Sequence, residues 1–188
     1  MTKELIDQEA IASQMRDVNR QIEDLRKKSI EISKTVFHTA VSNFFNTYPE
    51  VAAIRWRQYT PHFNDGDTCT FGVHELEFYS EADYENLKNG ELDDTYEFNS
   101  YNKPSDYVYR AAAEPNNRYR DHYQAEIDKY KKLVEEKGER FAVVANGIEQ
   151  FNKLFNEIDD DVMLSLFGDH VQVTVTKDGI DVDDHDHD

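Results

Sequence analysis

The sequence is poor in cysteine: Cys69 is the only one among 188 residues, so the chain cannot close an internal disulfide. No apolar run approaches the roughly 20 residues that a membrane-spanning helix needs. The first four residues, Met1-Thr2-Lys3-Glu4, lack the charged and then apolar layout of a signal peptide. These absences predict a protein of the reducing cytoplasm without a membrane anchor.

Sequence motifs of catalysis are missing as well. The chain has no Gly-rich phosphate loop, no Gly-x-Ser-x-Gly elbow, no His-Glu-x-x-His and no paired Cys-x-x-Cys. Cys69 falls within an expected strand, where a buried structural role is more typical than a nucleophilic one. These absences favour a non-enzymatic protein without a cofactor but do not decide the question. The alternative is a small-ligand-binding protein or a metal-dependent enzyme that uses the hairpin at residues 55–75.

Positive charge is scarce, since 21 basic residues face 39 acidic ones and the net charge is -18. Residues 1–50 and 117–158 are nearly neutral, whereas residues 81–116 carry three basic and nine acidic side chains, and residues 159–188 carry one and ten. Phosphate would be repelled, which argues against direct binding of nucleic acid or of an anionic membrane. The alternative to partner binding is that these acids only keep the protein soluble.

An acidic surface suits a protein partner that has a basic surface, such as a protein that normally holds DNA. The candidate contact residues for such a partner lie in the two acidic segments: Asp159, Asp160, Asp161, Asp181, Asp183, Asp184, Glu91, Asp93 and Asp94.

What the chain does contain is a helical pattern at its N-terminus. Apolar residues alternate in steps of four and three at Ile11, Met15, Val18, Ile22, Leu25, Ile32 and Val36, with Ser29 as the one polar member. The pattern predicts a helix over residues 3–47, either continuous or broken near Ser33. Its apolar stripe has two interpretations, which can both hold along different stretches: it packs against later helices of the same chain, or residues 11–36 pair with a second copy as a homodimer. A coiled-coil dimer of this kind would suit a structural or assembly protein, which is a further alternative for the function.

The middle of the chain changes to an extended pattern. Residues 51–79 alternate around Asp65-Gly66, a turn signal, and predict a β-hairpin with a bulge near His74-Glu75 that reconciles a slip in the alternation. Residues 81–116 are acidic and mostly irregular, with a short helix from Glu81 to Leu87.

The rest of the chain predicts helices within residues 117–158 and a short helix that Asp160 or Asp161 caps. Gly147 would cost its helix about 1 kcal/mol relative to alanine, unless a neighbouring helix uses the close approach. Residues 170–182 predict a C-terminal hairpin, followed by an Asp/His tail at 183–188. The expected fold is a single α+β domain over residues 1–182, with the long helix and two or three others packed on a small antiparallel sheet.

The hairpin holds the candidates for ligand chemistry. Arg55, Trp56, Arg57 and Tyr59 could face an anionic ligand, or the arginines could simply neutralise acids of the same chain. His62, Asp65 and Asp67 are weak candidates for a metal, together with His74 and Glu75. The turn and the later strand residues lie over ~20 Å apart in an extended hairpin, so we expect no metal site here. The tail histidines His185 and His187 lack the fixed surroundings that a metal centre needs.

One resemblance adds context. Residues 56–67, WRQYTPHFNDGD, followed by Cys69 and residues 71–73, resemble a segment of small uncharacterised proteins of tailed bacteriophages. The run FGDHVQVTV at 167–175 with residues 178–180 is similar in kind, and together they cover about a quarter of the chain. The resemblance implies a viral protein in a bacterial cytoplasm, acting on host or phage machinery as an inhibitor or a mimic of DNA charge. It implies no functional residues.

Overall fold

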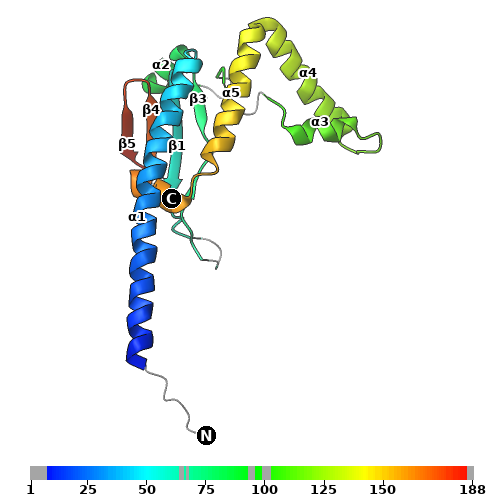
Figure 1. Ribbon diagram of the computed structural model, residues 1–188. Helices are drawn as coiled ribbons and strands as arrows, with labels where there is room; N and C mark the ends of the chain where they lie inside the picture. The colour runs from blue at the N-terminus through cyan, green and yellow to red at the C-terminus, as the bar shows by residue number, and fades with distance from the viewer. Residues whose placement is uncertain (1–7, 64–65, 67, 93–95, 99–102, 186–188) are drawn as a thin grey trace.

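The protein is an α+β structure in which a long helix and a small antiparallel sheet form the centre, as the computed structural model shows (Figure 1). The structure describes residues 8–63, 66, 68–92, 96–98 and 103–185. Within these residues it holds six helices and five short strands.

The sheet is built around its first strand, β1 (Ala53–Tyr59). One side of β1 pairs with β2 (Gly72–Val73) and then β3 (Glu77–Tyr79), and the other side pairs with β4 (Val171–Thr176), which pairs with β5 (Ile180–Asp184). The register shifts by one residue between the pairs Gln58–Val73 and Arg55–Glu77. The predicted bulge near His74 is therefore confirmed, and it lets the strand continue along β1 despite the slip in alternation.

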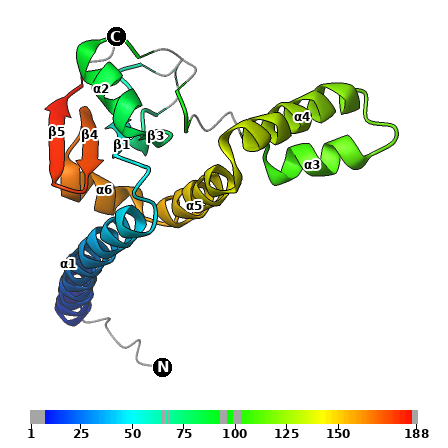
Figure 2. The same cartoon turned by 90° about the horizontal axis from the view of Figure 1, so that it is seen from above.

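One face of the sheet carries the core. The C-terminal half of α1 (Gln8–Thr47), α5 (Glu139–Phe155) and α6 (Asp160–Phe167) cover this face, while α2 (Glu81–Asn89) lies on the other side (Figure 2). Trp56 is at the centre, with its ring 5.2 Å from that of Phe155 and 5.3 Å from that of Phe167. Aromatic rings therefore supply much of the buried surface that joins the three helices to the sheet.

A helical hairpin extends away from the sheet. It is formed by α3 (Asp106–Ala113) and α4 (Arg120–Lys137), which pack against each other, and Figure 2 shows it pointing outward from the body. Gly138 joins α4 to α5 with a φ of 90°, a conformation that suits glycine. Tyr130 of α4 reaches the core cluster together with Phe98 and Phe141.

Several sequence-based expectations need correction. Residues 81–116 are less irregular than expected, because they contain α3 as well as the predicted α2. The C-terminal strand runs on to Asp184, so Asp183 and Asp184 belong to β5 rather than to a tail. Cys69 lies outside the strands and is half-buried.

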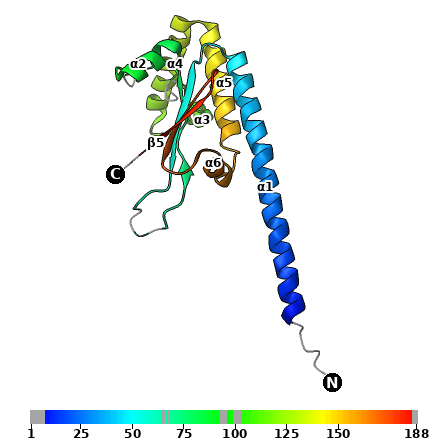
Figure 3. The same ribbon diagram turned by 90° about the vertical axis from the view of Figure 1, so that its left-hand side faces the viewer.

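The N-terminal helix is continuous over its 40 described residues, so there is no break near Ser33. Residues 3–7 of the predicted helix lie outside the described part of the chain. The interpretation that its apolar stripe packs against later helices is wrong for residues 11–36, because their seven apolar side chains are exposed. The N-terminal half of α1 runs clear of the body in both side views (Figures 1 and 3).

Candidate functional site

The acids at α6 have a local structural task. Asp159 is the N-cap, since its Oδ1 accepts a hydrogen bond of 2.9 Å from the backbone N–H of Asp161. The sequence had favoured Asp160 or Asp161 as the cap, and these two instead occupy the first turn, where carboxylates interact well with the helix dipole. Capping and dipole together account for three consecutive aspartates without any partner.

The acids of β5 form a second group, which we call the acidic edge: Asp181, Asp183 and Asp184. β5 is the outermost strand on its side of the sheet. Asp181 and Asp183 pair with Thr174 and Gln172, on the face of the sheet away from α1, α5 and α6, while Asp184 pairs with the buried Val171. All three carboxylates are exposed, so the strand presents negative charge on both of its faces.

The predicted partner residues do not lie on one surface. Glu91 follows α2, whereas Asp159, Asp160 and Asp161 lie at α6, and these two helices are on opposite sides of the sheet (Figure 2). Asp93 and Asp94 lie outside the described residues. The seven described acids share one property: all are exposed, and none has an ion pair among the described residues.

The predicted ligand-binding residues are divided between the two faces of β1. Trp56 points into the core and is 2% exposed. Arg55 lies on the other face, where its Nε donates to Glu77 Oε2 at 2.8 Å and its guanidinium lies 5.2 Å from the centre of the Tyr79 ring. Arg55 is thus used by an acid of the same chain, which is the alternative that the sequence left open.

Glu77, the acid beside Arg55, has a second partner in the buried Tyr79. The Tyr79 hydroxyl donates to Glu77 Oε2 at 2.7 Å, and burial together with this bond raises the pKa of Tyr79 above its ordinary range. Arg57 is exposed and pairs across the strands with Gln172. Arg55 and Arg57 share one face of β1, but Arg55 is already paired with Glu77, so an anion would have to displace this carboxylate to use both arginines.

The hairpin end of the sheet gathers imidazole rings. His62 and His170 are stacked with centroids 4.7 Å apart, and Tyr59 lies 4.2 Å from His74 and 5.9 Å from His185. Asp65 and Asp67, two of the weak metal candidates, lie outside the described residues. Among the residues that are described, no three His, Cys, Asp or Glu side chains are grouped so that they could hold a metal ion.

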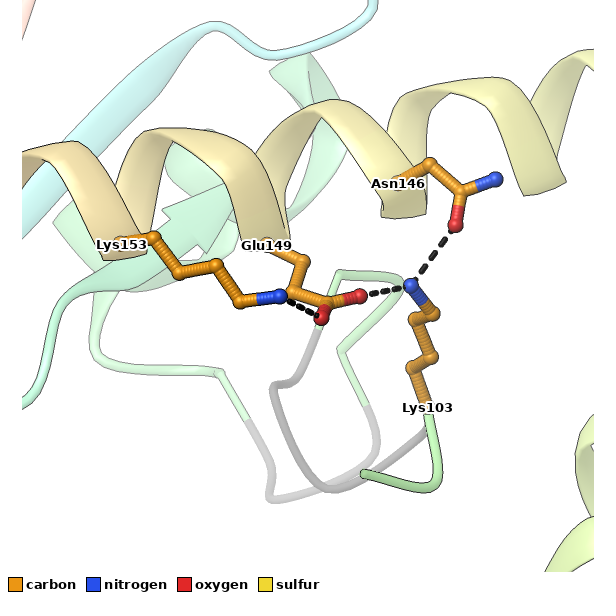
Figure 4. Close-up of polar contacts among 4 residues, drawn as sticks. All are labelled: Lys103, Asn146, Glu149 and Lys153. Atoms are coloured by element: carbon orange, nitrogen blue, oxygen red, sulfur yellow. Dashed lines mark hydrogen bonds and ion pairs between the residues drawn. The ribbon is translucent and has the colours of Figure 1, made fainter. Parts of the chain in front are cut away.

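A cavity of about 290 Å³ lies between α5 and two described segments, residues 97–98 and 103–105, and is mostly apolar. At its rim Glu149 accepts from two lysines, Lys103 and Lys153, and Lys103 also donates to Asn146 Oδ1 at 2.7 Å (Figure 4). These contacts lower the pKa of Glu149, and the hydrogen bond from Lys103 has a larger effect than that from Lys153. Because the lysines and the carboxylate satisfy one another, we interpret the group as a latch that fastens residues 103–105 to α5.

Two features were missed by sequence reasoning. Gln58 is fully buried: its Oε1 accepts from Trp56 Nε1 at 3.1 Å, and its Nε2 donates to the carbonyls of Met163 and Gly168. The only sign of this in the sequence was that Gln58 is a polar residue on the core side of β1. The α3–α4 hairpin displays tyrosines, with Tyr107 58% exposed, and the unpredicted α3 carries part of this surface.

An apolar stripe on α1 is left uncovered by the rest of the described chain. We call it the α1 seam, and its members are Ile11, Met15, Val18, Ile22, Leu25, Ser29, Ile32 and Val36. The apolar side chains are between 45% and 65% exposed. From Gln8 to Ser29 no side chain of the helix is buried.

In the part of the chain that the structure describes, no helix combines the length and the apolar character needed to cross a membrane. Comparison with known protein families, with curated proteins and with solved structures finds no match to this chain.

Proposed function

We propose that this chain is a non-enzymatic binding protein that presents the acidic edge to a basic surface of another protein. The observation that carries the proposal is the state of the three acids of the acidic edge, which are exposed and without ion pairs among the described residues. Glu77 and Glu149, by contrast, are used by cations of the same chain. Charge that is not neutralised internally remains available to a partner.

β5 is the best place for such a contact. Its three carboxylates lie within four residues on an outer strand, where they are accessible from both faces of the sheet. The competing explanation is that charges on an edge strand block pairing with other sheets. Both explanations require exposed acids, but only the first requires that a specific partner be lost when they are neutralised.

The resemblance to proteins of tailed bacteriophages supports a partner in the cytoplasm of a bacterial host, of host or phage origin. A partner that normally holds DNA fits the charge, and the protein would then act as an inhibitor that mimics DNA. In that case duplex DNA should compete with this protein for the partner's surface.

The test is capture of partners from bacterial lysate with the full chain, followed by affinity measurement at low and high salt. Replacing Asp181, Asp183 and Asp184 with asparagine should weaken binding at least tenfold and flatten its salt dependence. The matched control removes the same number of charges from α4, with Asp121→Asn, Asp128→Asn and Glu136→Gln. Each of these acids is paired with a neighbouring cation, so the control should retain binding.

Two results would contradict the proposal. One is an affinity that does not change between low and high salt. The other is equal weakening by the β5 variant and the α4 control, which would mean that only total charge matters.

A further inference from the structure

The α1 seam stays uncovered for a geometric reason. The side chains that α1 turns toward the body are Phe37, Val41 and Phe44, all buried, and Ile30 begins the same stripe. Ile30 and Phe37 each follow a seam position by one residue, Ser29 and Val36, and are therefore turned about 100° away from it around the helix. Val36 is therefore 51% exposed while its neighbour Phe37 is 2% exposed. The body occupies one side of α1 and leaves the seam free along its whole length.

The seam has the size and spacing of a coiled-coil interface. Its eight members follow steps of four and three from Ile11 to Val36, which is more than three heptads and about 39 Å of helix. Repeats of three to four heptads are the length at which coiled coils become recognisable and stable. A surface helix of a monomer would instead carry its apolar side chains against its own core, as the C-terminal part of α1 does.

Charge indicates what covers the seam. Residues 8–36 hold six basic and five acidic side chains, whereas the whole chain has a net charge of -18. Two copies of so acidic a protein repel each other over most of their surface, and the first part of α1 is a region where they do not. The seam is therefore suited to a partner that is itself acidic elsewhere, as a second copy is.

The residues that flank the seam are compatible with pairing to a second copy, because most of them are uncharged. The charged ones are Arg26 and Lys28, and the others are neutral: Ala12, Gln14, Asn19, Gln21, Ser33 and Thr35. In a parallel pair Arg26 faces Gln21 of the second copy, and Lys28 faces Ser33. In an antiparallel pair centred between Ile22 and Leu25, Arg26 faces Asn19 and Lys28 faces Gln21. Neither arrangement sets like charges opposite each other.

We propose that a second copy of this chain covers the α1 seam, so that the protein is a homodimer joined by a coiled coil over residues 11–36. This inference is independent of the acidic edge and holds whether or not that edge binds a partner. Apolar burial drives this contact, so it should persist at high salt, where a contact made by the acidic edge weakens.

The experiment is light scattering and sedimentation equilibrium of the full chain, from nanomolar to hundreds of micromolar concentration. We expect twice the chain mass of 22.0 kDa for the wild type. The seam variant Ile22→Glu with Leu25→Glu should sediment as a monomer, with a dissociation constant raised at least a hundredfold. The matched control, Arg20→Glu with Lys27→Glu, reverses two charges on the outer face of the same helix and should remain dimeric. Both pairs of residues are exposed, so circular dichroism should show the body folded in each variant.

Cysteine cross-linking in a Cys69→Ser background locates the contact. An Ile22→Cys disulfide between copies indicates a parallel pair, and a link between Met15→Cys and Ile32→Cys chains indicates an antiparallel one; Arg20→Cys should not link. A wild type that stays monomeric at every concentration would overturn the proposal and assign the seam to a partner of another sequence. A seam variant that dimerises as the wild type does would overturn it as well.

Discussion

At the scale of single residues, Gly147 shows how one hydrogen atom in place of a methyl group fixes a helix contact. The Cζ, Cε2 and Oη atoms of Tyr48 occupy the space where a Cβ of residue 147 would lie. Tyr48 follows the last turn of α1, and its ring lies 5.1 Å from that of Phe44. The close approach expected at this glycine is present, but it is made by the side chain of Tyr48, just after α1, and not by a neighbouring helix.

We predict that Gly147→Ala lowers the free energy of unfolding by about 1–3 kcal/mol, because the Tyr48 ring must be displaced. In a Tyr48→Ala background the obstacle is gone, and the same substitution should instead raise stability by up to about 1 kcal/mol through helix propensity. Urea unfolding of the four proteins of this cycle gives both values. An increase in stability in the wild-type background would contradict the contact.

Gln58 is the residue whose loss should be most costly relative to its size. Gln58→Leu would leave the Trp56 indole N–H and the carbonyls of Met163 and Gly168 without their partner. We expect a loss of at least about 2 kcal/mol in the free energy of unfolding. Gln172→Leu is the matched control, since Gln172 is a partly exposed glutamine on the neighbouring strand and should change stability by less than about 0.5 kcal/mol.

At the scale of elements, the Glu149 latch joins residues 103–105 to α5 and should respond to acid. The pKa of Glu149 is lowered in the folded state, chiefly by Lys103 and then by Lys153. The contribution of this carboxylate to stability is therefore present at neutral pH and is lost as pH falls. We expect Glu149→Gln to cost at most about 1 kcal/mol at neutral pH, because the pair is partly exposed. The difference from wild type should begin to shrink as the pH falls through about 4.5, the ordinary value for this carboxyl, and should vanish only below its lowered folded-state pKa.

The latch prediction needs a control for general effects of acid. Glu157→Gln removes an exposed carboxylate just after α5 that has no ion pair among the described residues. Its stability should follow that of the wild type at every pH in chemical unfolding. A constant difference between Glu149→Gln and wild type down to low pH would show that the latch does not act through charge.

At the scale of the whole molecule, the two proposals divide the surface by charge. The first part of α1 is nearly neutral and apolar along its seam, while β5 at the sheet edge is acidic. A dimer formed through α1 would carry two acidic edges, which raises the effective concentration of the second contact once the first is made. Salt separates the two contacts, because it should weaken binding by β5 and leave the α1 dimer intact.

The elements with strong periodicity or turn chemistry could be predicted from the amino-acid sequence alone. The step of four and three residues identified α1, the alternation around Asp65-Gly66 identified the hairpin, and a slip in that alternation identified the bulge near His74. α3 was missed because Tyr107, Val108 and Ala111 lie in an eight-residue helix, too short for a periodic signal to stand out among acids and prolines.

The contacts that the side chains of these elements make could not be predicted, because they depend on how the elements pack together. A heptad pattern looks the same whether it faces the protein's own core or solvent, and the choice here depends on which side of α1 meets the sheet. The two arginines of β1 were likewise ambiguous until Glu77 was seen beside Arg55. Such contacts join residues distant in sequence, and local patterns carry no information about which distant groups meet.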